Sequence, residues 1–227
     1  MTTADAIRLV QEGLSAASDP AKAGPMAAYM KTEMPFYGVQ KKGRTPVARA
    51  LLAAHPAADR HAYADTVRAL WGLPHREEKY VAIAYARAWD EWVDTASMGL
   101  FRELIVEGAW WDLVDEVAIK LVGRALLKER SETEPIVRPW IIDDILWLRR
   151  TSVICQIGHR ANTDAALLAD ACSANLDDAD FFIRKGIGWA LREYGKTDPA
   201  WVLAYVEAHH ASMSGLSKRE ATKHLRS

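Results

Sequence analysis

Cysteine is scarce in this chain, and several other features are missing that would define a common class of protein. Among 227 residues only Cys155 and Cys172 are cysteines, and they have no paired spacing, which argues against a disulfide scaffold or a zinc site. The seven histidines form no i, i+4 pair with one another, so we expect no metal. A P-loop, a G-x-S-x-G elbow and the Rossmann glycine pattern are also absent from the sequence. We therefore expect no cofactor.

Long apolar runs are missing as well. No stretch approaches the roughly 20 apolar residues that cross a bilayer. The first residues, 1–6, lack a basic region followed by an apolar run, so no secretory signal is expected. Hydrophobic residues make up 50% of the chain and charged residues 26%, which is typical of a folded globular protein. We expect a protein of the reducing cytoplasm that is not associated with membranes.

The charge of the chain is nearly balanced but unevenly distributed. The formal net charge is −1, which does not by itself indicate a nucleic-acid binder. Residues 181–227, however, carry eight Lys and Arg against four Asp and Glu. Any cationic surface must therefore be local, and the C-terminal end is where we expect it.

Strand-like alternation is almost absent, and the apolar residues recur with a helical period. Nine prolines fall mostly between the periodic segments, where we expect them to mark breaks between helices. Five predicted helices align on their apolar centres with separations of 35, 36, 34 and 34 residues; the centres are Ala82, Val117, Val153, Ile187 and Ala221. These helices span 77–86, 110–122, 146–157, 183–194 and 218–225. A period in the thirties predicts an all-α fold, an α-solenoid of helical pairs in one domain over residues 1–227, with a compact bundle as the alternative.

The segment around Asp115 carries the most informative spacing. Trp110, Leu113, Val114 and Val117 share one apolar stripe of a helix, on which we expect Trp110 to be core. Trp111 and Asp115 lie four residues apart on a different face, about 120° from the stripe on the helical wheel. An aromatic ring beside a carboxylate, both away from the packing face, suits a cationic ligand.

A second face interleaves aromatic and basic residues. Trp189 lies opposite the apolar stripe of its helix, and Lys185, Arg192 and Lys196 flank it with Phe182. Such a face is typical of surfaces that contact nucleic acid. In the alternative interpretation, Trp189 is core of the next helical layer.

Arg150 falls close to an apolar stripe, where a charge is costly unless it is paired. The functional interpretation is a guanidinium directed at a phosphate. The structural alternative is an ion pair with a carboxylate such as Asp143 or Asp144.

Several segments, taken in order along nearly the whole chain, resemble the AlkD-type DNA alkylation repair glycosylases. The most specific are WWDLVD at 110–115 and IGWALREY at 187–194; the others lie at 25–31, 38–40, 147–150 and 216–221. The resemblance implies a superhelix of HEAT-like repeats that cradles duplex DNA along its concave face. It also implies hydrolysis of the N-glycosidic bond of N3- and N7-alkylated purines. No lysine falls at a catalytic position in these segments, so we expect no lyase activity, and we expect the protein to be a monomer.

The resemblance also assigns roles to individual residues. Asp115 matches the catalytic carboxylate, and Trp111 and Trp189 match the tryptophans that contact the deoxyribose of the lesion. Tyr29 matches a nearby aromatic contact, and Arg150 matches an arginine that engages the DNA backbone.

One loop departs from the family. Gln40 lies where the family contacts DNA, and the family places Thr and Pro soon after this point. Here the basic segment 41–44, which we expect to form a loop, comes before Thr45 and Pro46.

The chemistry fits these residues, because an N3- or N7-alkylated purine is cationic and departs as a neutral base without protonation. One carboxylate is then enough to stabilise the oxocarbenium-like sugar and to orient water. Two other classes stay open: a non-catalytic DNA-binding or lesion-sensing solenoid, and a protein-binding scaffold.

Overall fold

The computed structural model describes residues 2–225, and every regular element in that range is helical, with no strand. The predicted all-α class is confirmed. The chain divides into two compact units, Met1–Val93 and Asp94–Ser227, which are described one at a time. That the whole chain forms a single repeat domain stays a prediction.

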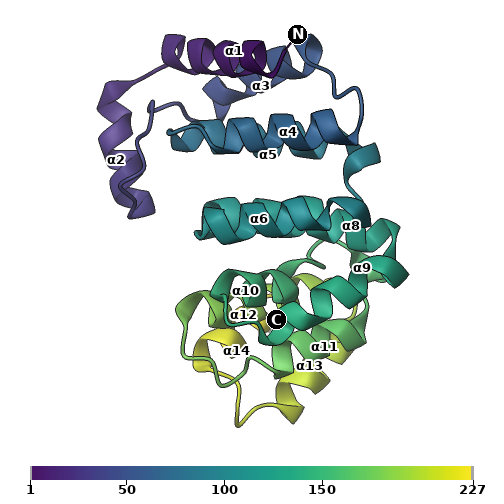
Figure 1. The fold of residues 1–227 in the computed structure, drawn as a ribbon. Helices are drawn as coiled ribbons and strands as arrows, with labels where there is room; N and C mark the ends of the chain where they lie inside the picture. The colour runs from purple at the N-terminus through teal and green to yellow at the C-terminus, as the bar shows by residue number, and fades with distance from the viewer. Residues whose placement is uncertain (1, 226–227) are drawn as a thin grey trace. The chain divides into compact units, whose positions relative to one another are not determined.

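Unit 1 consists of two packed helical layers. Helix α1 packs on α3, and α4 packs on α5 (Figure 1). Side chains from these helices form a fully buried core that includes Leu14, Leu51, Tyr63 and Tyr85. The elements are α1 (Thr3–Ala16), α2 (Pro20–Met30), α3 (Lys41–Ala54), α4 (Arg60–Trp71), α5 (Arg76–Ala88) and the 3-10 turn η1 (Asp90–Trp92).

Unit 2 stacks its helices in sequence, with α10 packed on α12 and α12 on α14 (Figure 1). Its first elements are η2 (Thr95–Ser97), α6 (Met98–Gly108), α7 (Trp111–Val117), the π-helix η3 (Ala118–Val122), α8 (Gly123–Lys128), α9 (Arg130–Val137) and η4 (Arg138–Ile142). Its remaining elements are α10 (Leu146–Ile154), η5 (Arg160–Asn162), α11 (Ala165–Ser173), α12 (Phe181–Tyr194), α13 (Pro199–Ala208) and α14 (Gly215–Ala221).

The repeat centres read from the sequence are buried in the structure. Ala82, Val117, Val153, Ile187 and Ala221 are each at most 1% exposed. They lie on α5, α7, α10, α12 and α14, the helices that correspond to the five predicted ones. The predicted buried positions are therefore confirmed, although the last predicted helix ends at Ala221 rather than residue 225.

The prediction that prolines mark breaks is wrong at three positions. Pro25, Pro46 and Pro135 lie inside α2, α3 and α9, each in the second turn of its helix. A proline this close to the N-terminus removes a single backbone hydrogen bond, so the helix tolerates it better than at its centre.

The basic segment 41–44 is likewise not a loop but the first turn of α3. The carbonyl of Gln40, the residue preceding the helix, accepts hydrogen bonds from the backbone N–H groups of Gly43 and Arg44.

The helix that carries Asp115 is less regular than predicted. Trp110 has an extended backbone and precedes α7, and the α-helix gives way to the π-helix at Ala118. At Gly123, where α8 begins, a Cβ atom would overlap the backbone carbonyl oxygen of Cys155 on the segment that follows α10. The widened turn therefore ends where two backbones lie in direct contact, a geometry that apolar periodicity does not encode.

We predict that Gly123→Ala lowers the free energy of unfolding by about 1–3 kcal/mol, since the methyl group meets backbone that cannot rotate away. Gly99→Ala on α6 is the matched control, because a Cβ there meets no heavy atom within 4 Å. It should change stability by less than about 0.5 kcal/mol, because Gly99 is the second residue of its helix and a Cβ there meets nothing. Urea denaturation of the two variants measures both effects, and equal stabilities would contradict the close contact at Gly123.

Candidate functional site

Helix α7 presents Asp115 and Trp111 on a face away from its apolar stripe. Leu113, Val114 and Val117 are fully buried, whereas Trp111 and Asp115 are each partly exposed. The predicted separation of the two faces is confirmed. The face of Asp115 is nevertheless not free of packing, because α7 also contacts α10.

Arg150 of α10 holds the Asp115 carboxylate in a bidentate ion pair. Arg150 Nε donates to Asp115 Oδ1 over 2.8 Å, and Nη2 donates to Oδ2 over 2.7 Å. The third guanidinium nitrogen, Nη1, donates to the backbone carbonyl of Phe182 on α12. Arg150 is only 3% exposed, so this pair joins three helices in the interior of unit 2.

The alternative partners suggested by the sequence, Asp143 and Asp144, are wrong. The Asp143 carboxylate accepts instead from the backbone N–H of Ile145, over 2.8 Å. The backbone carbonyls of both aspartates accept from Arg149 rather than Arg150. Arg150 thus binds Asp115, which is 35 residues away in sequence, and neither of the two nearby aspartates.

Gly186 of α12 makes room for the guanidinium. A Cβ at this position would lie 3.1 Å from Arg150 Nη1, so a larger side chain would compete with the arginine for space. Sequence reasoning did not identify Gly186 or the Phe182 carbonyl as part of the site.

Burial raises the pKa of Asp115 above its ordinary value, and Asp112 and Glu116 raise it further. The hydrogen bonds and positive charge of Arg150 act in the opposite direction and lower it. The desolvation effect prevails because the carboxylate loses most of its water.

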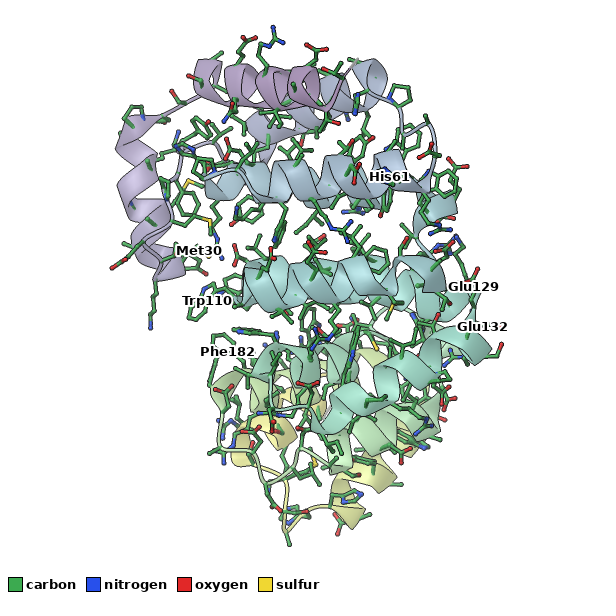
Figure 2. The ribbon with its side chains drawn as sticks, viewed as in Figure 1. Met30, His61, Trp110, Glu129, Glu132 and Phe182 are labelled. Carbon is green, nitrogen blue, oxygen red and sulfur yellow. The ribbon has the colours of Figure 1, made fainter. Side chains whose placement is uncertain are left out.

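An aromatic cluster borders the ion pair. Trp110, Trp147 and Phe182 contact one another, with ring centroids 5.1 to 6.1 Å apart. Figure 2 labels two of them, Trp110 and Phe182. Phe181 extends the cluster outward and is 58% exposed. Trp110, expected in the core, is only partly buried, because as the residue preceding α7 it does not share the helical register.

The aromatic and basic face of α12 exists, but its cations are paired. Trp189 is partly exposed and so is not fully buried core. Lys185 and Arg192 both bind Glu220 of α14, and Lys196 binds Glu193 over 2.7 Å. Glu220 is a further residue that the sequence reasoning missed.

Tyr29 and Gln40 belong to unit 1, whereas the other predicted site residues belong to unit 2. Tyr29 lies on α2 and is 73% exposed. Gln40 is exposed at the end of a loop that the buried Glu77 carboxylate anchors. The Glu77 oxygens accept hydrogen bonds from the backbone N–H groups of residues 37, 38 and 39 over 2.9 to 3.1 Å. These bonds fix the backbone that leads to Gln40.

Within residues 2–225, no three His, Cys, Asp or Glu side chains come together in a way that could hold a metal ion. In the same range, no helix is long and apolar enough to cross a membrane.

The sequence profile of the family described as "DNA alkylation repair enzyme" matches residues 10–225. The chain therefore belongs to the DNA alkylation repair enzyme family. Membership indicates a repair enzyme that acts on DNA.

Two solved structures are similar to this chain. A predicted DNA alkylation repair enzyme from Enterococcus faecalis is 29% identical, with a TM-score of 0.85, over 92% of this chain and 97% of its own. AlkD2 from Streptococcus mutans is 14% identical, with a TM-score of 0.65, over 90% of this chain and 99% of its own. The second likeness concerns the fold alone and confirms the helical-repeat architecture. No curated protein sequence matches the chain.

We predict that Arg150→Ala lowers the free energy of unfolding by about 3–5 kcal/mol, because it leaves a mostly buried carboxylate without its cation. Arg150→Lys keeps the charge but not the planar fork, and should cost less. Arg138→Lys serves as control, since this arginine also binds two carboxylates, Glu134 and Asp170, but is 42% exposed. It should cost less than about 1 kcal/mol. Chemical denaturation that ranks the control with Arg150→Ala would contradict a structural role for the buried pair.

Proposed function

We propose that this protein is a DNA glycosylase that hydrolyses the N-glycosidic bond of cationic N3- and N7-alkylated purines in duplex DNA. The observation that carries the proposal is the Asp115 carboxylate, which Arg150 binds through both oxygens. Asp115 lies on the same helix as the partly exposed Trp111. Membership of the repair family supports it.

The substrate carries the positive charge that makes this simple site sufficient. As the bond from sugar to base breaks, the electron pair stays on the alkylated purine, which leaves neutral. The positive charge moves to the deoxyribose, where Asp115 stabilises it. Asp115 accepts a hydrogen bond from the water that attacks the anomeric carbon, and the proton that this water loses passes to bulk solvent.

The ion pair with Arg150 limits how much Asp115 contributes. A carboxylate about 4 Å from the developing cation attracts it by roughly 4 kcal/mol at an effective dielectric constant of 20. A guanidinium about 8 Å away on the far side repels it by roughly 2 kcal/mol. The net stabilisation, about 2 kcal/mol, corresponds to a rate effect on the order of 30-fold.

Because the repulsion by Arg150 offsets about half of the attraction by Asp115, the tryptophans contribute a larger share of the stabilisation of the sugar cation. The indole faces of Trp111 and Trp189 each add about 0.5–2 kcal/mol of cation–π attraction to a desolvated cation. Together the two indoles match the net contribution of the carboxylate. Tyr29, which belongs to unit 1, is proposed separately as an aromatic contact to the DNA.

The remaining predicted residues bind the DNA backbone in this proposal. Lys185 and Arg192 supply positive charge from α12, and Lys196 supplies it from the turn that follows this helix. Gln40 supplies a contact from the start of α3. Arg150, predicted to engage the DNA backbone, is instead given the role of holding Asp115, because all three of its guanidinium nitrogens donate within the protein. No lysine attacks the sugar, so the enzyme leaves an abasic site and does not cut the strand.

We predict release of N7-methylguanine and N3-methyladenine from methylated duplex DNA, and no measurable release of uracil, because no acid protonates a neutral leaving base. Asp115→Asn should lower the release rate at least tenfold while DNA binding persists. Chromatography of released bases measures the release rates of the unaltered protein and of the variant. A thermal melt establishes that the variant folds. Binding without any base release by the unaltered protein would instead favour the non-catalytic DNA-binding alternative, and efficient uracil release would refute the mechanism.

The pH dependence of base release should follow the ionisation of Asp115. Only the charged carboxylate stabilises the sugar cation, and burial raises its pKa above the ordinary value of 3.8. Activity should therefore fall as the pH drops through this raised pKa, at a higher pH than an exposed aspartate would require. The residual rate of Asp115→Asn should be flat over the same interval. An acid limb that survives in this variant would assign the ionisation to another group.

A further inference from the structure

A single carboxylate on α14 binds two of the three cations that flank Trp189, Lys185 and Arg192. Glu220 Oε1 lies 2.8 Å from Lys185 Nζ, and Glu220 Oε2 accepts from Arg192 Nη1. The hydrogen bond from Lys185 and the charges of both cations keep the pKa of Glu220 below its usual range. Glu220 is therefore a charged acid in the free protein.

The position of Glu220 depends on a glycine contact between the two helices. A Cβ at Gly188 of α12 would lie 2.9 Å from the backbone carbonyl oxygen of Ser217 and against Glu220 itself. The Ser217 hydroxyl also donates to the carbonyl of Arg184, over 2.9 Å. Helix α14 is thus held so close to α12 that Glu220 sits between Lys185 and Arg192, which are seven residues apart.

We propose that Glu220 occupies the position that a DNA phosphate takes in the complex, and so limits the affinity of the protein for undamaged DNA. The proposal rests on the DNA-binding role proposed for Lys185 and Arg192.

The chemistry of the cluster favours exchange with a phosphate. Carboxylate and phosphate oxygens bind ammonium and guanidinium groups in the same way. The Lys185 side chain is 40% exposed and can reach a phosphate by rotation about its four-carbon stem. Each new phosphate contact then replaces an existing ion pair, so the net gain in binding free energy is small. The protein therefore dissociates readily from undamaged duplex.

The direct test is Glu220→Gln, which keeps the shape of the side chain and removes its charge. Binding to undamaged duplex, followed by fluorescence anisotropy at about 0.1 M salt, should tighten on the order of 3–10-fold. The plot of log affinity against log salt should steepen by about one to two units, because one or two more cations then displace counterions. Weaker binding, or an unchanged slope, would mean that Glu220 only ties α14 to α12.

Glu134→Gln on α9 is the matched control. Glu134 is 19% exposed and binds Arg138 over 2.7 Å, while Glu220 is 15% exposed. The control removes the same charge from a similar ion pair, so a gain in affinity from net charge alone would occur in both variants. We expect the steeper slope only for Glu220→Gln, and an equal change in both would overturn the proposal.

A double-mutant cycle keeps the test decisive if Glu220→Gln is destabilised. Lys185→Gln should reduce the salt slope more in the Glu220→Gln background than in the unaltered protein, because only there is the lysine free. Additive effects would refute the exchange. Since binding to undamaged DNA is the readout, the result is independent of whether the protein releases alkylated bases.

Discussion

The bidentate ion pair between Arg150 and Asp115 is the interaction on which the candidate site depends. A guanidinium that is 3% exposed is stable only if every direction of its fork meets an acceptor. Two directions meet the carboxylate, and the third meets the Phe182 carbonyl. This requirement fixes α7, α10 and α12 relative to one another. It also explains why α12 carries Gly186 where a side chain would displace the arginine.

The spacing of this pair follows from the repeat. Asp115, Arg150, Lys185 and Glu220 stand at intervals of 35 residues, close to the period of the buried centres. Equivalent positions of successive repeats face each other, so residues one period apart become neighbours. The two ion pairs, Asp115 with Arg150 and Lys185 with Glu220, are thus the same contact made twice with the signs reversed.

Much of the fold was predictable because apolar periodicity is a local property, and the centres Val117, Val153 and Ile187 are buried as expected. The partner of Arg150 was not predicted, because Asp143 and Asp144 are near in sequence whereas Asp115 is one repeat away. The 35-residue interval was the signal that could have identified Asp115 as the partner of Arg150 and Glu220 as the partner of Lys185. No comparable signal marks the π-helix at residues 118–122, which ends beside the close backbone contact at Gly123.

The two equivalent ion pairs differ mainly in their access to water, and this difference separates their roles. The Arg150 side chain is 4% exposed, so breaking its pair would leave a charge without solvent. The Lys185 side chain is 40% exposed, and water or a phosphate can replace its carboxylate at little cost. The pair of Arg150 with Asp115 therefore holds the carboxylate that we assign to catalysis, while the pair of Lys185 with Glu220 is the one that we propose can open. The same contact, made twice, thus supplies a buried pair that we assign to catalysis and a pair that we propose can exchange. The two carboxylates are similarly exposed, at 14% and 15%, so the exposure of the cation is what distinguishes the pairs.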